Sequence, residues 1–341
     1  MILNMLTDSS KKYRSLELCA GAGGQALGIE AAGFEHAALI EIDRDACLTL
    51  KANRPDWNVI QVDLNTFDAS PFLGVDLLAA GVPCPPFSRA GRKLGVDDER
   101  NLFPATIEIL KGIKPRSVML ENVRGFLDSS FAPVREELKS ALASEGLELR
   151  WSLVKSSAFG VPQLRPRAIG IGLPPALWPF FEWPRDSSDY STVGDVLYTE
   201  MSSRGWLGAD SWRLMANKIA PTLVGGSKKH GGPDLGPTRS KRQWAELGVD
   251  GLSIADEPPG PDFLGKPRLT VKMAALLQGF PADWKFIGKK TSCYRQVGNA
   301  FPPPVSSALA SEIRRVLECA DNVPEALERK RSQLGSHSFI L

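Results

Sequence analysis

The chain has 341 residues, of which 43% are hydrophobic and 23% charged, and its formal net charge is +2. This composition is typical of a folded globular protein, and the length allows two domains. No stretch reaches the roughly 18 unbroken apolar residues of a membrane span, so we expect a cytoplasmic protein without a membrane partner. The five cysteines are far apart and form no C-x-x-C pair, which argues against disulfides and against a metal site.

Short apolar runs alternate with helical patterns in the first half of the chain. Six runs predict buried strands, at Ser15–Cys19, Ala37–Ile42, Val59–Val62, Val75–Ala80, Ser117–Leu120 and Ala168–Leu173. Four segments predict helices, at Gly24–Ala32, Arg44–Asn53, Leu102–Ile113 and Pro133–Glu145. This alternation predicts an α/β fold with a doubly wound, Rossmann-like sheet, whose ligands bind at the carboxyl ends of the strands.

The pattern changes after residue 173. The following residues are rich in Gly, Pro, Ser and Trp and have few sustained periodic runs. We interpret residues 1–173 as a catalytic and cofactor-binding domain and residues 174–290 as a smaller, irregular, β-rich domain for target recognition. Helical patterns return at Val271–Gly279 and Val305–Glu318. We expect residues 291–320 to return to the first domain and residues 321–341 to form a polar tail.

A glycine turn follows the first predicted strand. Gly21, Gly23 and Gly24 let the backbone approach a ligand, and the next helix offers free amides and a positive dipole end. Glu41 lies twenty positions after Gly21, where a carboxylate can accept hydrogen bonds from a ribose. The turn also fits the looser dinucleotide fingerprint, which leaves a nicotinamide-dependent oxidoreductase as an alternative. A tight turn that needs glycine only for its shape is another.

A thiol follows the fourth predicted strand. Cys84 stands between Pro83 and Pro85, so its loop is rigid and irregular. Basic residues beginning at Arg89 favour the thiolate, which is the reactive form. Glu121, at the end of the next predicted strand, can act as an acid or base if burial raises its pKa. Two alternatives without a catalytic role remain. Cys84 can be buried as a small hydrophobic residue, and Glu121 can lie in solvent at the end of its strand.

In their order and spacing these motifs resemble those of the C5-cytosine DNA methyltransferases. The resemblance spans about residues 15 to 315 and rests on Gly21–Gly24, Glu41, Asp63, Pro83-Cys84, Glu121-Asn122-Val123, Gln163-x-Arg165-x-Arg167, Arg268-Leu269-Thr270 and Gln296-x-Gly298-Asn299. It implies a monomeric bacterial enzyme of the restriction-modification type, bound to double-stranded DNA in the nucleoid. The implied cofactor is S-adenosylmethionine, with S-adenosylhomocysteine as product. A cognate restriction endonuclease that acts on the same site is an implied partner.

The resemblance also implies a role for each motif. Cys84 adds to carbon 6 of a flipped-out cytosine, while Glu121 contacts N3 and the exocyclic amine. Arg167 contacts O2, and Arg165 steadies the loop. The implied cofactor-binding residues are Cys19, Ala20, Gly21, Gly23, Gly24, Glu41, Ile42, Asp63, Leu64, Pro83 and Asn299. Cys19 replaces a usual aromatic residue, which affects the packing of adenine, and Pro85 replaces a common glutamine.

A basic window predicts the surface that reads DNA. Between Arg213 and Arg242, seven Lys and Arg residues face a single acidic residue, Asp234. The pair Thr222-Leu223 resembles one that the family carries in its target-recognition region. Because arginine binds guanine through two hydrogen bonds and lysine mainly supplies charge to phosphate, we expect a guanine-containing site. The predicted DNA-binding residues are Ser88, Arg89, Arg92, Thr222, Lys228, Lys229, Arg239, Lys241 and Arg242.

Three rival interpretations follow from the same residues. An oxidoreductase does not explain why Pro-Cys, Glu-Asn-Val and Gln-x-Arg-x-Arg occur together in this order. A tRNA-methylating branch shares the catalytic set, but the variable region here lacks a Cys-Phe-Thr motif. A catalytically silent DNA- or cofactor-binding module is opposed by the intact Cys84, Glu121 and Arg167.

Overall fold

The computed structural model describes residues 11–83, 101–185, 190–226 and 232–334. A seven-stranded sheet forms the centre of the molecule, in the order β3-β2-β1-β4-β5-β7-β6. Its strands are β1 Tyr13–Leu18, β2 Phe34–Glu41, β3 Val59–Gln61, β4 Leu77–Ala80, β5 Ser117–Val123, β6 Glu148–Lys155 and β7 Pro166–Leu173. β7 pairs antiparallel with both of its neighbours, and the other pairs are parallel. The parallel strands therefore end at one common edge, where the predicted site residues follow them.

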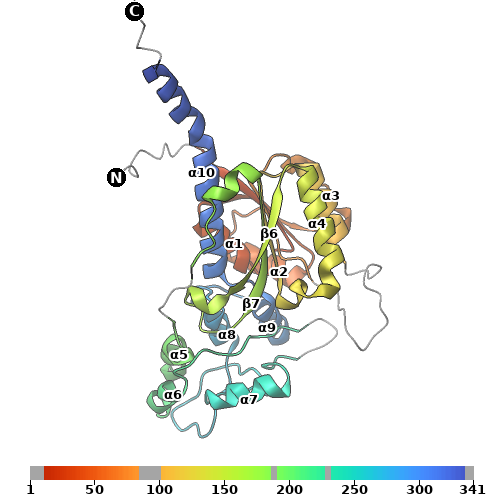
Figure 1. Ribbon diagram of the computed structural model, residues 1–341. Helices are drawn as coiled ribbons and strands as arrows, with labels where there is room; N and C mark the ends of the chain where they lie inside the picture. Colours follow the sequence, from red (N-terminus) through yellow and green to blue (C-terminus); the bar gives the residue numbers. More distant parts are fainter. Residues whose placement is uncertain (1–10, 84–100, 186–189, 227–231, 335–341) are drawn as a thin grey trace, which may run out of the picture.

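Helices cover both faces of the sheet (Figure 1). On one face, Leu78 of β4 packs in a core with residues of α3 Phe103–Ile113 and α4 Ala132–Ser144. On the other face, Ala79 packs in a core with residues of α1 Gly24–Ala31 and α10 Pro303–Leu334. α2 Arg44–Asn53 packs over Leu39 of β2. Adjacent strand residues thus point to opposite cores, as expected for a sheet buried on both sides, and the doubly wound α/β prediction is confirmed.

A second core lies beyond the carboxyl edge of the sheet, where Figure 1 shows the remaining helices grouped at one end. The helices are α5 Val193–Ser202, α6 Ala209–Met215, α7 Thr238–Glu246, α8 Val271–Leu277 and α9 Lys290–Asn299. Their core includes the buried indoles of Trp206, Trp212 and Trp244.

The prediction of a β-rich second region is wrong for the described residues. Between residues 174 and 290 they form helices, joined by loops with isolated bridges such as Ala255 to Thr270. The helical pattern predicted at Val271–Gly279 is confirmed as α8, whereas the other helices of this range are short, and some are held by few large side chains. α7, for example, buries Trp244 alone. A helix with one buried aromatic residue carries no sustained 3.6-residue period to detect.

Two further differences concern the edges of the fold. The six predicted strands are confirmed, but β6 was missed. Its burial alternates only weakly because it is an edge strand, so its sequence ELRWSLVK resembles a surface segment. The last helix continues to Leu334, past the position at which a polar tail was expected to begin. Among the described residues, no helix is both long and apolar enough to cross a membrane.

Candidate functional site

The glycine turn after β1 has the backbone geometry that its sequence predicts. Gly21 and Gly23 adopt positive φ angles of 55° and 88°, and Gly23 caps α1. A Cβ on Gly23 would lie 2.7 Å from the Leu50 side chain, and one on Gly24 would lie 2.2 Å from the Phe301 carbonyl oxygen. At Gly21, by contrast, no described atom outside its chain neighbours lies within 4 Å of that position. The turn is therefore packed on two sides and open at Gly21.

Glu41 ends β2 beside this opening. Its carboxylate accepts hydrogen bonds from the backbone amides of Gly21 at 2.7 Å, Ile42 at 2.9 Å and Asp43 at 2.7 Å. Burial raises the pKa of Glu41 above its usual value, while the three amides oppose that change. The side chain of Ile42 is 60% exposed next to it. The arrangement presents a fixed acceptor and an apolar surface at the open side of the turn.

Three other predicted cofactor residues have local structural roles. Asp63 caps a short 3-10 helix, Leu64–Thr66, by accepting hydrogen bonds from the backbone and side-chain nitrogens of Asn65, both at 2.9 Å. The side chain of Leu64 is buried in the core, as is that of Ala20. Only the backbone of these two apolar residues is therefore placed to meet a ligand at this edge.

Cys19 precedes the turn in an unusual conformation for a residue with a side chain, at a φ of 57°. Burial, and then the carboxylates of Glu41, Glu17 and Asp63, raise the pKa of its thiol. The thiol therefore stays neutral, and Cys19 contributes shape and polar backbone atoms rather than a nucleophile.

Two buried polar side chains beneath the turn were not among the predicted site residues. Glu17 is 1% exposed, and burial followed by the charge of Glu41 raises its pKa well above the usual value. Gln25 is 4% exposed. The Oε2 atom of Glu17 and the Nε2 atom of Gln25 have no hydrogen-bond partner among the described residues. The sequence signal that could have found both residues is a polar side chain at a position of a strand or helix that faces the core.

An ion pair links the two strands that carry the predicted catalytic residues. The Nε atom of Arg167, in β7, lies 2.8 Å from Oε1 of Glu121, in β5, and both side chains are at least 86% buried. Burial lowers the pKa of Arg167, and Glu121 opposes that change. The structure therefore brings together two residues that are far apart in the chain and holds both in a water-poor setting, where charge interactions are strong.

The backbone just before the thiol is attached to the same strand. Asn122 is 4% exposed, and its Nδ2 atom donates to the Val82 carbonyl oxygen at 3.0 Å. Pro83 follows and is exposed. Cys84 lies outside the described residues, as do Ser88, Arg89, Arg92, Lys228 and Lys229. Asn122 thus positions the start of the segment that carries the thiol, a role that sequence analysis did not assign to it.

Arg165 has a different environment from Arg167. It is 1% exposed, and its guanidinium donates to the carbonyl oxygens of Leu223, Gly298 and Ala300 at 2.8, 3.0 and 2.7 Å. Gln163 accepts from the Leu223 amide at 3.1 Å. Because its described bonds all go to backbone carbonyls of other segments, Arg165 is a positioning residue that connects the sheet to the second region.

Asn299 ends α9 and faces the second region in this structure. Its Nδ2 atom donates to the Gly226 carbonyl oxygen at 3.1 Å. A Cβ on Gly225 would lie 2.5 Å from the Arg295 carbonyl oxygen, so this segment packs closely on α9. The contact fixes the segment that follows Thr222, whose side chain is partly exposed.

The predicted DNA-binding residues of α7 fall into two groups. Arg239 and Arg242 are exposed. Lys241 is only partly exposed and pairs with Asp234 at 3.0 Å. Arg213 pairs with Asp195, which lies outside the basic window, at 2.9 Å. Pairing therefore reduces the effective positive charge of the window, whose exposed cations in the described part of the chain include Lys218, Arg239 and Arg242.

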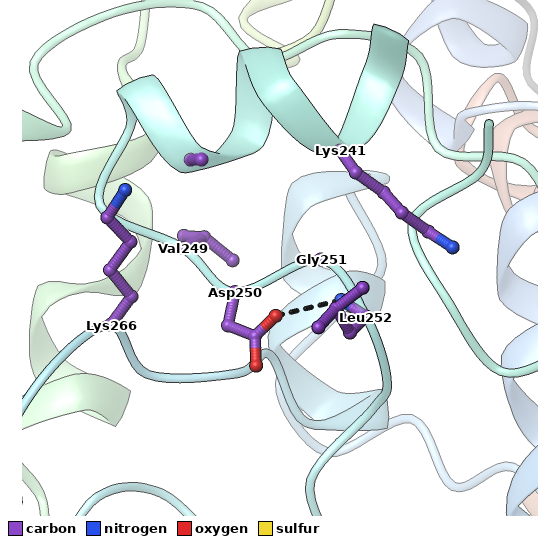
Figure 2. Close-up of a pocket in the computed structure, with 7 residues that line it drawn as sticks. Lys241, Val249, Asp250, Gly251, Leu252 and Lys266 are labelled. Carbon is purple, nitrogen blue, oxygen red and sulfur yellow. Dashed lines mark hydrogen bonds between the residues drawn. The ribbon is translucent and has the colours of Figure 1, made fainter. Parts of the chain in front are cut away.

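A shallow pocket lies beside α7 (Figure 2). Its lining consists of Lys241, Ala245, Val249, Asp250, Gly251, Leu252 and Lys266. Asp250 accepts from the Leu252 amide at 3.0 Å and from Arg268 at 2.7 Å. The carboxylate is thus already bonded, and this hollow is separate from the strand edge described above. The described residues contain no group of three or more His, Cys, Asp and Glu that could hold a metal ion.

Comparison with known proteins agrees with this geometry. The family model described as C-5 cytosine-specific DNA methylase matches residues 13–315. The Type II methyltransferase M.NaeI of Lentzea aerocolonigenes is 50% identical over 308 residues, which cover 89% of this chain and 75% of that protein. The Type II methyltransferase M.NgoMIV of Neisseria gonorrhoeae is 49% identical over 311 residues, covering 90% and 99%.

Solved structures show the same fold at lower identity. The S. pombe Dnmt2 methyltransferase is 20% identical with a TM-score of 0.62, and the Entamoeba histolytica methyltransferase EhMeth is 14% identical with a TM-score of 0.65. Each comparison covers 90% of this chain and 99% of the other. With the family model and the two relatives near half identity, these findings show that the chain belongs to the C-5 cytosine-specific DNA methylases, enzymes that methylate carbon 5 of cytosine in DNA.

Proposed function

We propose that this methyltransferase acts on a cytosine flipped out of a specific duplex DNA site, through a covalent bond to Cys84. The observation that carries the proposal is the buried Glu121–Arg167 ion pair, at the sheet edge shared with the glycine turn. Asn122, next to Glu121, holds the backbone that leads to Cys84. The Glu121–Arg167 pair, the backbone that leads to Cys84 and the glycine turn therefore belong to one edge of the sheet, which supports the proposal.

S-adenosylmethionine is the proposed cofactor, and the residues at the glycine turn fit it. Gly21 leaves open space, Glu41 offers a carboxylate that three amides orient toward it, and exposed Ile42 offers an apolar surface for adenine. When bound, this cofactor supplies an electrophilic methyl group. Glu41 would accept hydrogen bonds from the ribose hydroxyls.

The protein's own residues would drive the chemistry on the base. The Cys84 thiolate forms a bond to carbon 6, which makes carbon 5 nucleophilic. Glu121 and Arg167 hold the polar edge of the ring and stabilise the charge that develops on it. After carbon 5 gains the methyl group, its proton leaves to a base, and the electron pair of that bond expels the thiolate. The cysteine is regenerated.

Recognition of the target site is proposed for α7 and the segment that follows Thr222. Arg239 and Arg242 are exposed three residues apart on one helix, so both can face one groove of DNA. Lys228 and Lys229 would supply phosphate contacts. Because M.NaeI and M.NgoMIV are Type II methyltransferases, we also propose a cognate endonuclease for the same site. We propose a monomer that acts on DNA in the bacterial cytoplasm.

Methyl transfer from labelled S-adenosylmethionine tests this function on two substrates. We expect label in duplex DNA that contains many different sites, and none in tRNA. Label in tRNA alone would replace the proposal with an RNA methyltransferase. Absence of transfer to either, from a folded protein that binds S-adenosylhomocysteine, would indicate a silent binding module.

A further inference from the structure

The backbone of Leu223 is held at both of its polar groups by the segment that leads into β7. The Leu223 amide donates to Oε1 of Gln163 at 3.1 Å, and its carbonyl oxygen accepts from the Arg165 guanidinium at 2.8 Å. All three residues are buried, so water has little access to these bonds. Leu223 belongs to residues 222–226, which we call the recognition segment. Its backbone is thus fixed by a side chain that lies 60 positions away in the sequence, that of Gln163.

Gln163 is itself locked in position. Its Nε2 atom donates to the Leu277 carbonyl oxygen at 2.8 Å and to Oε1 of Gln278. Gln278 extends the connection to α9, because its Nε2 atom donates to the carbonyl oxygens of Val297 and Ala300 at 3.0 and 2.9 Å. Both polar atoms of the Gln163 amide are therefore used, and its oxygen faces the recognition segment in one orientation only.

Two glycines let the recognition segment cross α9 in direct backbone contact. A Cβ on Gly298 would lie 2.4 Å from the Gly225 amide nitrogen, and one on Gly225 would lie 2.6 Å from Oδ1 of Asn299. Asn299 also donates to the Gly226 carbonyl oxygen at 3.1 Å. Arg165 joins the two sides, because it donates to the Gly298 carbonyl oxygen at 3.0 Å as well as to the recognition segment. The crossing leaves no room for a methyl group on either backbone.

We propose that Gln163 is a positioning residue which, with the Gly225–Gly298 crossing, sets the recognition segment in register with the Glu121–Arg167 pair and so makes methylation depend on the target sequence. The inference rests on the proposed function, because it takes the recognition segment as part of the surface that reads DNA.

The connection to the reacting base is short. Gln163 lies four positions before Arg167, and Arg165 lies midway between them. A shift of Leu223 relative to β7 would therefore move the recognition segment relative to the Glu121–Arg167 pair. Such a shift matters because a misplacement of about 1 Å can cost about 10²-fold in rate. Gln163 would thus affect which sites are methylated without itself contacting DNA.

Methylation rates on two kinds of duplex DNA test this role. The target site is first read from the 5-methylcytosine positions that the wild-type protein makes in DNA, and near-target duplexes then differ from it at one base pair. Gln163→Met keeps the length of the side chain but removes its amide. It should lower kcat/KM about tenfold or more on the target and much less on near-target duplexes, because only the target is aligned by the recognition segment. Affinity for S-adenosylhomocysteine in calorimetry should stay within about twofold of wild type.

The ratio of the two rates separates positioning from stability. Partial unfolding of a variant lowers both rates by the same factor and leaves their ratio unchanged, whereas a misplaced recognition segment reduces the ratio. Gln163→Asn is assayed as well, because it keeps an amide but is one methylene group shorter. It should also reduce the ratio, and it decides the test if Gln163→Met does not fold.

Gly225→Ala disturbs the recognition segment from its other side. The added methyl group would lie 2.5 Å from the Arg295 carbonyl oxygen, so the two backbones must separate. The same reduced ratio is expected. Gly260→Ala is the matched control in the second region, because a Cβ there meets no described atom within 4 Å outside its chain neighbours. This variant should keep the wild-type ratio.

The outcomes distinguish the positioning role from the proposed function. An unchanged ratio in the Gln163 variants, or in Gly225→Ala, would overturn the positioning role and leave the proposed function standing. A loss in Gly260→Ala as large as that in Gly225→Ala would do the same, because any substitution in the second region would then suffice. Absence of methylation of duplex DNA by the wild-type protein, or methylation without a preferred site, would overturn the proposed function, and the positioning role with it.

Discussion

Glu121 and Arg167 form a buried ion pair 2.8 Å long between β5 and β7, although 46 positions separate them in the chain. The pair joins a parallel strand to the single reversed strand of the sheet, at the edge where the other parallel strands also end. A substrate ring held there would meet one anionic and one cationic side chain. This relationship leads to the first prediction.

Glu121→Gln should lower turnover by about 10²–10⁴-fold, because the amide keeps a hydrogen bond but can neither take up nor deliver a proton at the ring and no longer pairs with the charge of Arg167. Calorimetry should show that affinity for S-adenosylhomocysteine changes far less. A large loss of turnover with little loss of cofactor affinity would assign Glu121 to the chemical step. If cofactor binding were abolished while residual turnover stayed normal, Glu121 would belong to the cofactor site instead.

Cys84 should be the covalent nucleophile. Duplex DNA with 5-fluorocytosine at the target should trap wild-type protein as a denaturation-resistant adduct, because fluorine does not leave carbon 5 as a proton does. Cys84→Ala should give no adduct in gel electrophoresis, while Cys319→Ala, at an exposed cysteine of α10, should give the wild-type yield. Equal yields from wild type and Cys84→Ala would remove the assignment.

Arg165→Met should destabilise the protein by about 3 kcal/mol or more, because the carbonyl groups of Leu223, Gly298 and Ala300 each lose one donor, and only Ala300 keeps a second, from Gln278 at 2.9 Å, among the described side-chain bonds. Chemical denaturation gives the free energy of unfolding. Arg242→Met, an exposed arginine on α7, is the matched control and should change stability by less than about 0.5 kcal/mol. A small effect of Arg165→Met would show that water or neighbouring groups replace these bonds.

His36 should make stability depend on pH in the acidic range. Burial lowers its pKa from 6.5 to about 4. As pH falls below 6.5, the unfolded chain binds a proton that the folded chain excludes, so stability is lost between about pH 6.5 and 4. The contribution is at most about 3 kcal/mol. His36→Gln should show a shallower loss over this interval in urea unfolding, and an unchanged slope would exclude His36 as its source.

The exposed arginines of α7 should contribute to sequence specificity. Arg239→Ala should cost roughly 1–3 kcal/mol in binding, mainly on the cognate site. Lys228→Ala combined with Lys229→Ala should weaken binding to all DNA and reduce the salt dependence by at most about two units of slope. Lys111→Ala, on α3, controls for the loss of a positive charge. Wild-type binding and methylation by both variants at several salt concentrations would place recognition elsewhere.

Much of the catalytic region could be predicted from the sequence, because its signals are local. Glycines at Gly21 and Gly23 are required by positive φ angles within one turn. The apolar runs of strands buried on both faces are continuous over a few residues, so six of the seven strands were found. The roles of Cys84, Arg89, Arg92, Lys228 and Lys229 are still predictions, since those residues lie outside the described part of the chain.

The second region was harder to predict, because its helices depend on distant contacts. Trp244 makes α7 stable by packing among side chains from α5, α6 and α8, and no periodic pattern in the nine residues of α7 reveals this. Lys241 also counted as a free positive charge until the fold placed it beside Asp234. Its local sequence gave no sign of that pairing.

The sequence by itself determined the order of the motifs, the α/β alternation and the family, because residue identity and local spacing carry that information. Only the tertiary structure decided which side chains meet. It paired Glu121 with Arg167, used Arg165 to join distant carbonyls, and placed the backbone of Leu223 between Gln163 and Arg165. The physical reason is that burial and partner choice arise when strands and helices pack, and a polar side chain takes its function from the groups that packing brings within hydrogen-bond distance.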